Sequence, residues 1–161
     1  MKQEYVNPFL TPAQMVWQKE FGCVLKIQNA EAVSHQYTTD DVTAIIGISG
    51  KLEGNVLYGF TEDLVRQIVQ RLVGEEVDPR DQMALSALGE IANVITGNAA
   101  TQLAASGYGC DISPPVILEP VGATLTAGVP KQIQVTFESE MGLLRVRIGL
   151  AENSSSNESA A

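Results

Sequence analysis

The sequence predicts an α+β fold in which helices pack on a largely antiparallel sheet. Helical spacing of apolar residues appears over residues 61–73 and 78–106, and β-branched or alternating segments appear at 42–60 and 132–150. The resulting order is helix, strands, helix, helix, strands, which also permits a two-half pseudo-symmetry. At 161 residues and 45% hydrophobic content, the chain is long enough to bury one core, so we expect a single domain over residues 1–150.

The first helix is predicted to begin at the Asn-Pro pair of residues 7–8 or the Thr-Pro pair of residues 11–12. A capping side chain followed by proline is typical of a helix start. The helix is expected to end at Phe21, because Gly22 is a common terminator.

Three strands are expected in the first half of the chain. Residues 23–29 form a candidate strand, and residues 30–40 are polar and carry no strand pattern. Residues 42–50 are β-branched and nearly all apolar, which predicts a buried strand. A turn over residues 51–54 then leads into residues 55–60, where apolar side chains alternate.

The middle of the chain predicts two helices. Thr61 caps the first, and Gly74 ends it. Its apolar side chains recur at helical spacing, at Leu64, Val65, Ile68, Val69, Leu72 and Val73. The second helix is long, is expected to open at Asp78 with Pro79, and ends near Ser106 before Gly107.

The last third of the chain has strand character. Residues 114–120 are proline-rich and suit an edge strand, within a variable loop expected over residues 116–131. Residues 132–139 and 142–150 predict a hairpin with one apolar face. On its other face Arg145 and Arg147 are expected to meet Gln134, Thr136 and Glu138. Residues 151–161 are polar and are expected to form a disordered tail.

Composition excludes several classes of function. A formal net charge of -9 would repel nucleic acid and anionic membranes, so neither is expected as a partner. The N-terminus lacks the apolar core of a signal peptide, and no stretch approaches a membrane span, which favours a cytoplasmic protein. A single histidine, His35, and two distant cysteines, Cys23 and Cys110, cannot build a metal site, so no metal is expected in this chain.

The long helix carries one narrow polar stripe. From Met83 to Ser106 its single ionisable residue is Glu90, and helical projection places the stripe within about 60°. Its members are Ser86, Glu90, Asn93 and Gly97, with Gln82 one turn earlier and Gly89 beside them. An ordinary solvated face explains a Glu and an Asn, and close helix packing explains the glycines. Spacing alone therefore predicts a docking surface or shallow site, and no reaction.

The same residues resemble a known signature. Ser86-x-x-x-Glu90-x-x-Asn93 is similar to the D/S-x3-E-x2-N motif of the CheC/CheX/FliY chemotaxis phosphatases. The segments "YVNPFL" and "GEIANVITGNAATQLAASG" resemble the opening and the motif helix of CheX-like chains. CheC-like members carry the motif on two helices, whereas the helix over residues 61–73 contains no asparagine. The resemblance is therefore to CheX-like members, and it covers most of residues 4–150.

This resemblance implies a phosphatase that hydrolyses the aspartyl phosphate of a CheY-like receiver domain. The receiver would hold the Mg2+, and this chain would hold no cofactor. Asn93 would orient the attacking water, which suits an amide because it both donates and accepts hydrogen bonds. Glu90 would pair with the receiver's lysine, whereas Ser86 has no assigned role. CheX-like relatives are homodimers, so a homodimer is expected here as well.

Two other classes stay open at this stage. The same helix ridge would also serve a receiver-binding adaptor that does not accelerate hydrolysis. An enzyme that uses Cys23 or Cys110 is the weakest alternative, because neither thiol has an evident activating partner in the sequence.

Overall fold

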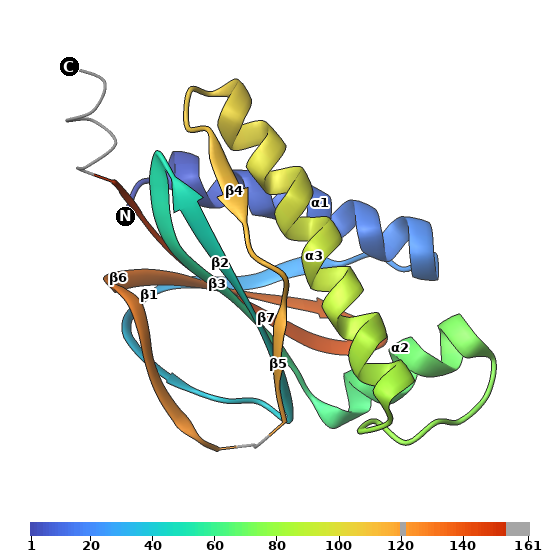
Figure 1. Ribbon diagram of the computed structural model, residues 1–161. Coiled ribbons are helices and arrows are strands. Elements are labelled where there is room, and N and C mark those ends of the chain that lie inside the picture. Colours follow the sequence, from blue (N-terminus) through green and yellow to red (C-terminus); the bar gives the residue numbers. More distant parts are fainter. Residues whose placement is uncertain (120–121, 154–161) are drawn as a thin grey trace.

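The computed structural model describes residues 1–119 and 122–153. Within them, three helices accompany one antiparallel sheet of seven strands, which confirms the predicted α+β class (Figure 1). The elements are α1 (Gln3–Phe21), β1 (Lys26–Thr38), β2 (Val42–Gly50), β3 (Leu52–Phe60), α2 (Glu62–Val73), α3 (Gln82–Ala105), β4 (Cys110–Ile112), β5 (Val116–Leu118), β6 (Thr124–Ser139) and β7 (Gly142–Glu152).

The strand order is β1-β6-β7-β3-β2-β4, and β5 also pairs with β2. The sheet curls, and α1 and α3 pack against each other on one side of it (Figure 1). One continuous core lies between the helices and the sheet and includes fully buried Trp17, Tyr58 and Phe60. No helix of the described residues is long and apolar enough to cross a membrane.

The predicted C-terminal hairpin is confirmed, residue for residue, on its apolar face. Ile133 lies opposite Ile148, and the next pairs along this face are Val135 with Val146 and Phe137 with Leu144. Cross-strand apolar pairs of this kind stabilise a hairpin and define its register.

The two arginines on the other face of the hairpin have different partners. Arg147 donates to Gln134 Oε1 at 3.0 Å and to the Gln36 carbonyl at 2.6 Å, and its guanidinium lies 4.8 Å from the Tyr37 ring centroid. Burial lowers the pKa of Arg147. Arg145 forms an ion pair with Asp40 at 2.5 Å, rather than the predicted cross-strand contact. Asp40 comes from a distant loop, so local register does not reveal it.

The predicted helix over residues 61–73 is confirmed. The Thr61 side chain accepts the Leu64 N–H, and Gly74 closes the helix in the left-handed conformation at φ 83°. Its core residues are fully buried, but Leu72 and Val73 are 43% and 40% exposed. The apolar stripe therefore extends beyond the core at the C-terminal end of α2.

Two predicted helix starts were wrong. The first helix begins at Gln3 and contains Pro8 and Pro12, because burial of Tyr5 and Phe9 offsets the backbone hydrogen bonds that proline removes. The long helix begins at Gln82 and not at Asp78, because residues 78–81 form a turn in which Asp78 accepts the Arg80 N–H at 2.9 Å.

Several strand boundaries also differ from the prediction. The candidate strand at 23–29 and the polar stretch at 30–40 are largely one strand, β1, most of whose side chains are exposed. A strand that is exposed on both faces has no apolar alternation to reveal it. Residues 124–131 also belong to a strand, β6, and not to the expected loop. The expected turn over 51–54 is shorter, since β3 begins at Leu52, and β4 was not predicted.

Strand β7 continues to Glu152, beyond the expected end of the domain at residue 150. Ala151 and Glu152 therefore belong to the sheet, and residues 154–161 of the expected tail lie outside the described residues. The two-half pseudo-symmetry stays a prediction.

Candidate functional site

The site is built on α3, a 24-residue helix whose first turn is capped by Asp81. Asp81 Oδ1 accepts the Met83 N–H at 2.9 Å. Three apolar side chains of α3, Leu88, Ile95 and Leu103, are completely buried against the core. That burial determines which side of the helix remains available to a partner.

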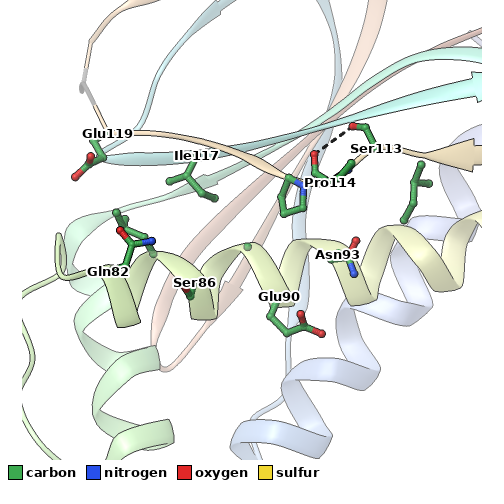
Figure 2. A pocket seen from close by; sticks show the side chains of 12 residues that line it. Gln82, Ser86, Glu90, Asn93, Ser113, Pro114, Ile117 and Glu119 are labelled. Carbon is green, nitrogen blue, oxygen red and sulfur yellow. Dashed lines mark hydrogen bonds between the residues drawn. The ribbon is translucent and has the colours of Figure 1, made fainter.

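A cleft of about 760 Å³ runs along α3. We call it the α3 cleft (Figure 2). Its helix side consists of Gln82, Leu85, Ser86, Gly89, Glu90 and Asn93, and its opposite side consists of Ile112, Ser113, Pro114, Pro115, Ile117 and Glu119. The structure therefore brings five of the six predicted site residues together, and Gly97 lies outside the cleft.

The polar side chains of the predicted motif are available for bonding to a partner. Within the described residues no hydrogen bond or ion pair is formed by the side chains of Ser86, Glu90 or Asn93. Other polar side chains of α3 bond locally, since Asn98 donates to the Val94 carbonyl at 2.9 Å and Thr101 to the Gly97 carbonyl at 3.1 Å. Unlike these two, the motif side chains can therefore bond to a partner without first breaking a contact within the protein.

Asn93 and Glu90 point in different directions. Asn93 is half-buried and extends toward Ser113 and Pro114, whereas the exposed Glu90 side chain extends away from these two residues (Figure 2). Glu90 also lines a second, more apolar groove of about 640 Å³ between α1 and α3, together with Met15 and Val94. A partner that contacts Glu90 and Asn93 together must therefore cover the ridge of α3 between the α3 cleft and this groove.

The two glycines of the stripe face neighbouring side chains at ordinary contact distances. A Cβ on buried Gly89 would lie 3.4 Å from Pro115 Cγ and 3.6 Å from Ile117 Cδ1, and one on Gly97 would lie 3.9 Å from Ile112 Cδ1. Gly89 thus faces the segment that follows β4, and Gly97 faces the end of β4. These distances are ordinary contacts that a methyl group would satisfy, so close helix packing does not explain the two glycines.

Sequence reasoning missed the opposite side of the cleft. Ser113, Pro114 and Pro115, which we call the proline wall, connect β4 to β5 along the edge of β2. The Pro-Pro pair was a visible signal for an irregular edge segment. Only the tertiary structure places that segment against Gly89 and opposite Asn93.

The charges that line the α3 cleft are all negative. Glu90 and Glu119 are its charged lining residues, and neither Lys nor Arg contributes to it. A site without a cation does not neutralise a phosphoryl group by itself, because stabilisation of transferring phosphoryl charge requires metal ions or basic side chains. Within the described residues no group of three or more His, Cys, Asp or Glu side chains could hold a metal ion. The cleft suits a cationic group and an oriented water.

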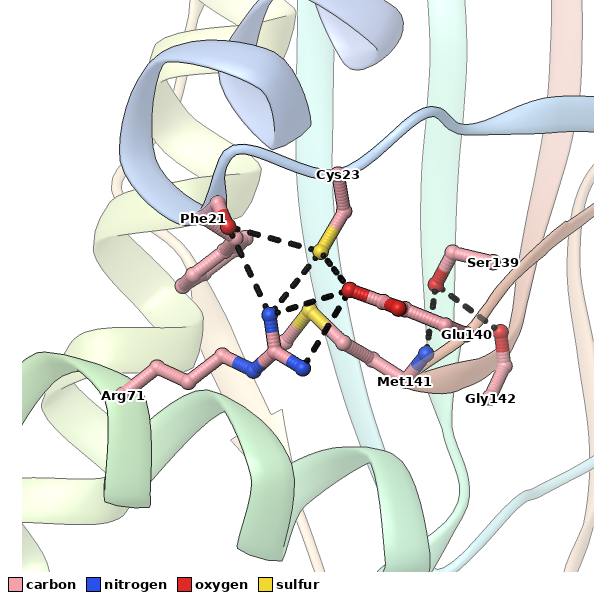
Figure 3. Close-up of polar contacts among 7 residues, drawn as sticks. All are labelled: Phe21, Cys23, Arg71, Ser139, Glu140, Met141 and Gly142. Carbon is pink, nitrogen blue, oxygen red and sulfur yellow. Dashed lines mark hydrogen bonds and ion pairs between the residues drawn. The ribbon is translucent and has the colours of Figure 1, made fainter.

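Cys23 has polar partners that the sequence did not reveal. Its buried Sγ lies 2.9 Å from Arg71 Nη1 and 3.0 Å from Glu140 Oε1 (Figure 3). The hydrogen bond to Glu140, followed by burial, raises the pKa of this thiol despite the nearby guanidinium. Burial, followed by the charge of Asp111, also raises the pKa of Cys110. Since the thiolate is the nucleophile, neither site favours cysteine catalysis.

Comparison with known proteins identifies the family. Residues 42–138 match the family model described as "Chemotaxis phosphatase CheX". The chain is 29% identical over 119 residues to the CheY-P phosphatase CheX of Thermotoga maritima, covering 73% of this chain and 77% of that protein.

Solved structures have the same fold. The chemotaxis protein CheX of Vibrio vulnificus superposes with a TM-score of 0.83 at 29% identity, over 92% of this chain and 99% of that one. CheX of Borrelia burgdorferi, solved as a complex with CheY, BeF3 and Mg2+, superposes with a TM-score of 0.66 at 24% identity, over 92% and 98% of the two chains. The family model covers more than half of the sequence, and its range includes all residues that line the α3 cleft. The chain belongs to the CheX family of chemotaxis phosphatases.

Proposed function

We propose that the protein hydrolyses the aspartyl phosphate of a CheY-like receiver domain and that α3 carries the catalytic residues. One observation carries this proposal. The side chains of Glu90 and Asn93 form no hydrogen bond or ion pair within the described residues, and they border a cleft that no Lys or Arg side chain lines. Such a cleft needs a substrate that brings its own positive charge. A receiver domain that binds Mg2+ and contains a lysine beside the phosphoryl group meets this requirement.

Asn93 acts by orienting water. Its amide donates one hydrogen bond and accepts another, so it holds a water in line with phosphorus without changing charge. In phosphoryl transfer, positioning supplies much of the rate enhancement, and the metal ion on the receiver neutralises the developing charge. The half-buried position of Asn93 restricts the side chain to few rotamers, which favours one water position.

Glu90 anchors the receiver. Its exposed carboxylate pairs with the receiver's lysine, and this charge-assisted hydrogen bond strengthens as docking excludes water. Because the Glu90 and Asn93 side chains point in different directions from one stripe of α3, the two contacts together define how the receiver sits on the helix. Ser86 lies one turn before Glu90 and is a candidate contact for the same receiver surface.

The relatives support the choice of substrate. The Thermotoga maritima protein is named a CheY-P phosphatase, and the Borrelia burgdorferi protein was solved with CheY, BeF3 and Mg2+. Receiver domains are phosphorylated in the cytoplasm, so we place this protein there.

The decisive experiment measures inorganic phosphate released from a CheY-type receiver that has been phosphorylated in the presence of magnesium, with and without this protein. Acceleration that disappears when EDTA removes the magnesium supports the proposal. Unchanged release at saturating protein, with binding demonstrated in the same samples, contradicts it and favours a receiver-binding adaptor on the same helix.

We also propose a homodimer. β1 ends the sheet, and within the described residues its outer edge pairs with no other strand over its 13 residues. An edge of this length is a template for pairing with a second copy. Light scattering at micromolar concentration should give twice the mass of 17.2 kDa, and a monomeric mass there would contradict the dimer.

A further inference from the structure

The outer edge of β2 is paired in two separate pieces. β5 pairs with residues 43–45, β4 pairs with residues 48–50, and the proline wall crosses the gap between them. Pro114 and Pro115 have no N–H, so they cannot continue the ladder along β2. The wall therefore needs another attachment to the sheet.

Ser113 provides this attachment through two reciprocal hydrogen bonds with Gly47. The Ser113 N–H donates to the Gly47 carbonyl at 2.9 Å, and the Gly47 N–H donates to Ser113 Oγ at 2.8 Å. The hydroxyl thus replaces the backbone acceptor that the ladder lacks here, and it donates onward to the Pro114 carbonyl at 3.3 Å. A Cβ on Gly47 would lie 3.2 Å from Ser113 Oγ, so the glycine makes room for this contact.

On its other side the proline wall rests on α3. Pro115 and Ile117 are the nearest neighbours of the position where Gly89 would carry a Cβ. The wall is held between β2 and α3, and it faces Asn93 across the cleft (Figure 2). Proline restricts the backbone, so the attachment at Ser113 defines where this segment stands.

We infer that Ser113 is a positioning residue: by clamping the proline wall to Gly47, it holds the side of the cleft opposite Asn93 and so orients the receiver's phosphorylated loop for attack. This inference rests on the proposed function. Ser113 acts through the wall and does not touch the reacting atoms. Docking depends chiefly on Glu90, whose side chain extends away from the proline wall (Figure 2). Loosening the wall therefore affects the orientation of the bound receiver more than the affinity with which the receiver binds.

The test uses the full chain with Ser113→Ala, the conservative variant Ser113→Thr, and the control Ser49→Ala. Ser49 is an exposed serine on the same strand as Gly47, and within the described residues its side chain makes no hydrogen bond. The first readout is the amide exchange rate of Gly47. It should rise about tenfold in Ser113→Ala because its acceptor is gone, and it should stay near the wild-type rate in Ser113→Thr and Ser49→Ala.

The second readout is steady-state phosphate release from the phosphorylated receiver. Ser113→Ala should lower kcat about three- to tenfold while KM changes less than about twofold, since small misplacement at a reacting centre costs rate more than binding. Ser113→Thr should restore kcat. Gly47→Ala crowds the same clamp from β2 and should also lower kcat, which provides a second variant if Ser113→Ala is poorly folded.

Three results would overturn the inference. An unchanged amide exchange rate of Gly47 in Ser113→Ala would show that the Ser113 hydroxyl does not clamp Gly47. Faster Gly47 exchange in Ser113→Ala with an unchanged kcat would show that the clamp does not position the receiver. A lowered kcat in Ser113→Ala that Ser113→Thr does not restore would show that the hydroxyl is not responsible for the loss. If the wild-type protein releases no phosphate, the proposed function and the positioning role both fail. The exchange data would still show whether Ser113 holds Gly47 through the two hydrogen bonds.

Discussion

Tyr58 on β3 donates its phenolic hydrogen bond to Thr96 on α3, with the two oxygens 2.7 Å apart in the core. The Thr96 hydroxyl donates its single hydrogen to the Ala92 carbonyl at 2.8 Å, so Tyr58 must be the donor in the bond between the two side chains. Thr96 follows Asn93 by three residues on the same helix. This buried bond therefore acts with the apolar packing of α3 to orient the helix on the sheet, and with it Asn93.

The two partners of this bond should differ in the cost of their removal. Thr96→Val leaves the buried Tyr58 hydroxyl without an acceptor and should lower the free energy of unfolding by about 1–3 kcal/mol. Tyr58→Phe leaves Thr96 bonded to Ala92 and should cost only about 1 kcal/mol. Urea denaturation measures both values, and a Tyr58→Phe cost larger than that of Thr96→Val would contradict the assignment.

Stability should fall at alkaline pH, and the tyrosines should account for part of the loss. Burial raises the pKa of Tyr58 above its ordinary value of 10.0 and raises that of Tyr37 to about 12. A raised pKa in the folded state gives stability that is complete below pH 10 and is lost as the pH rises toward the folded value. Denaturation at pH 9 to 12 should show a shallower decline in Tyr37→Phe and Tyr58→Phe. Equal slopes in wild type and both variants would exclude this contribution.

Asn93→Ala should abolish most of the phosphate release while leaving receiver binding intact. Loss of the group that orients water should lower kcat by about 100-fold. The matched control is Asn98→Ala, because Asn98 is an exposed asparagine of α3 that bonds only its own helix. Phosphate release and titration calorimetry against the BeF3-loaded receiver measure the two effects. If Asn98→Ala is equally inactive, the loss reflects the helix and not the water.

Glu90→Ala should weaken both binding and phosphate release. A charge-assisted hydrogen bond contributes about 1.5–3 kcal/mol, so affinity for the receiver should fall about 10- to 100-fold. Glu90→Gln keeps the shape and loses the charge, and it should also lose the salt dependence of binding. Glu53→Gln on β3 makes the same change of net charge outside the cleft and should bind normally. Wild-type affinity in Glu90→Ala would place the anchor elsewhere.

Gly89→Ala should be stabilising. Its methyl group would meet Pro115 and Ile117 at 3.4 and 3.6 Å, which is ordinary contact, and alanine in a helix interior is favoured over glycine by about 1 kcal/mol. Thermal unfolding should therefore shift upward, with phosphate release within about twofold of wild type because the methyl points at the wall and not into the open cleft. Gly54→Ala is the opposite control, since its Cβ would clash with the Gly149 carbonyl and its φ is 147°. A destabilised Gly89→Ala would show that the wall lies closer to α3 than these contacts indicate.

Features set by neighbouring residues were predictable from the sequence. The motif stripe follows from helical periodicity, so Ser86, Glu90 and Asn93 had to share one side of any helix that formed there. The hairpin of β6 and β7 follows from alternation and a short turn, and the ends of α1 and α2 follow from Gly22 and Gly74. The corrected boundaries lie where exposure on both faces removes the apolar pattern, as in β1, or where burial outweighs the cost of Pro8 and Pro12.

The other half of the cleft was decided by the tertiary structure. Ser113 meets Gly47 across 66 residues of chain, and Arg145 meets Asp40 across 105. Contacts of this range depend on which strands lie beside β2 and β7 in the sheet, and no local pattern encodes that arrangement. The sequence by itself determined a helix with a polar stripe of carboxylate and amide. Only packing of that helix against the edge of β2 turned the stripe into one side of a cleft, because the opposite side comes from a segment whose position depends on the sheet.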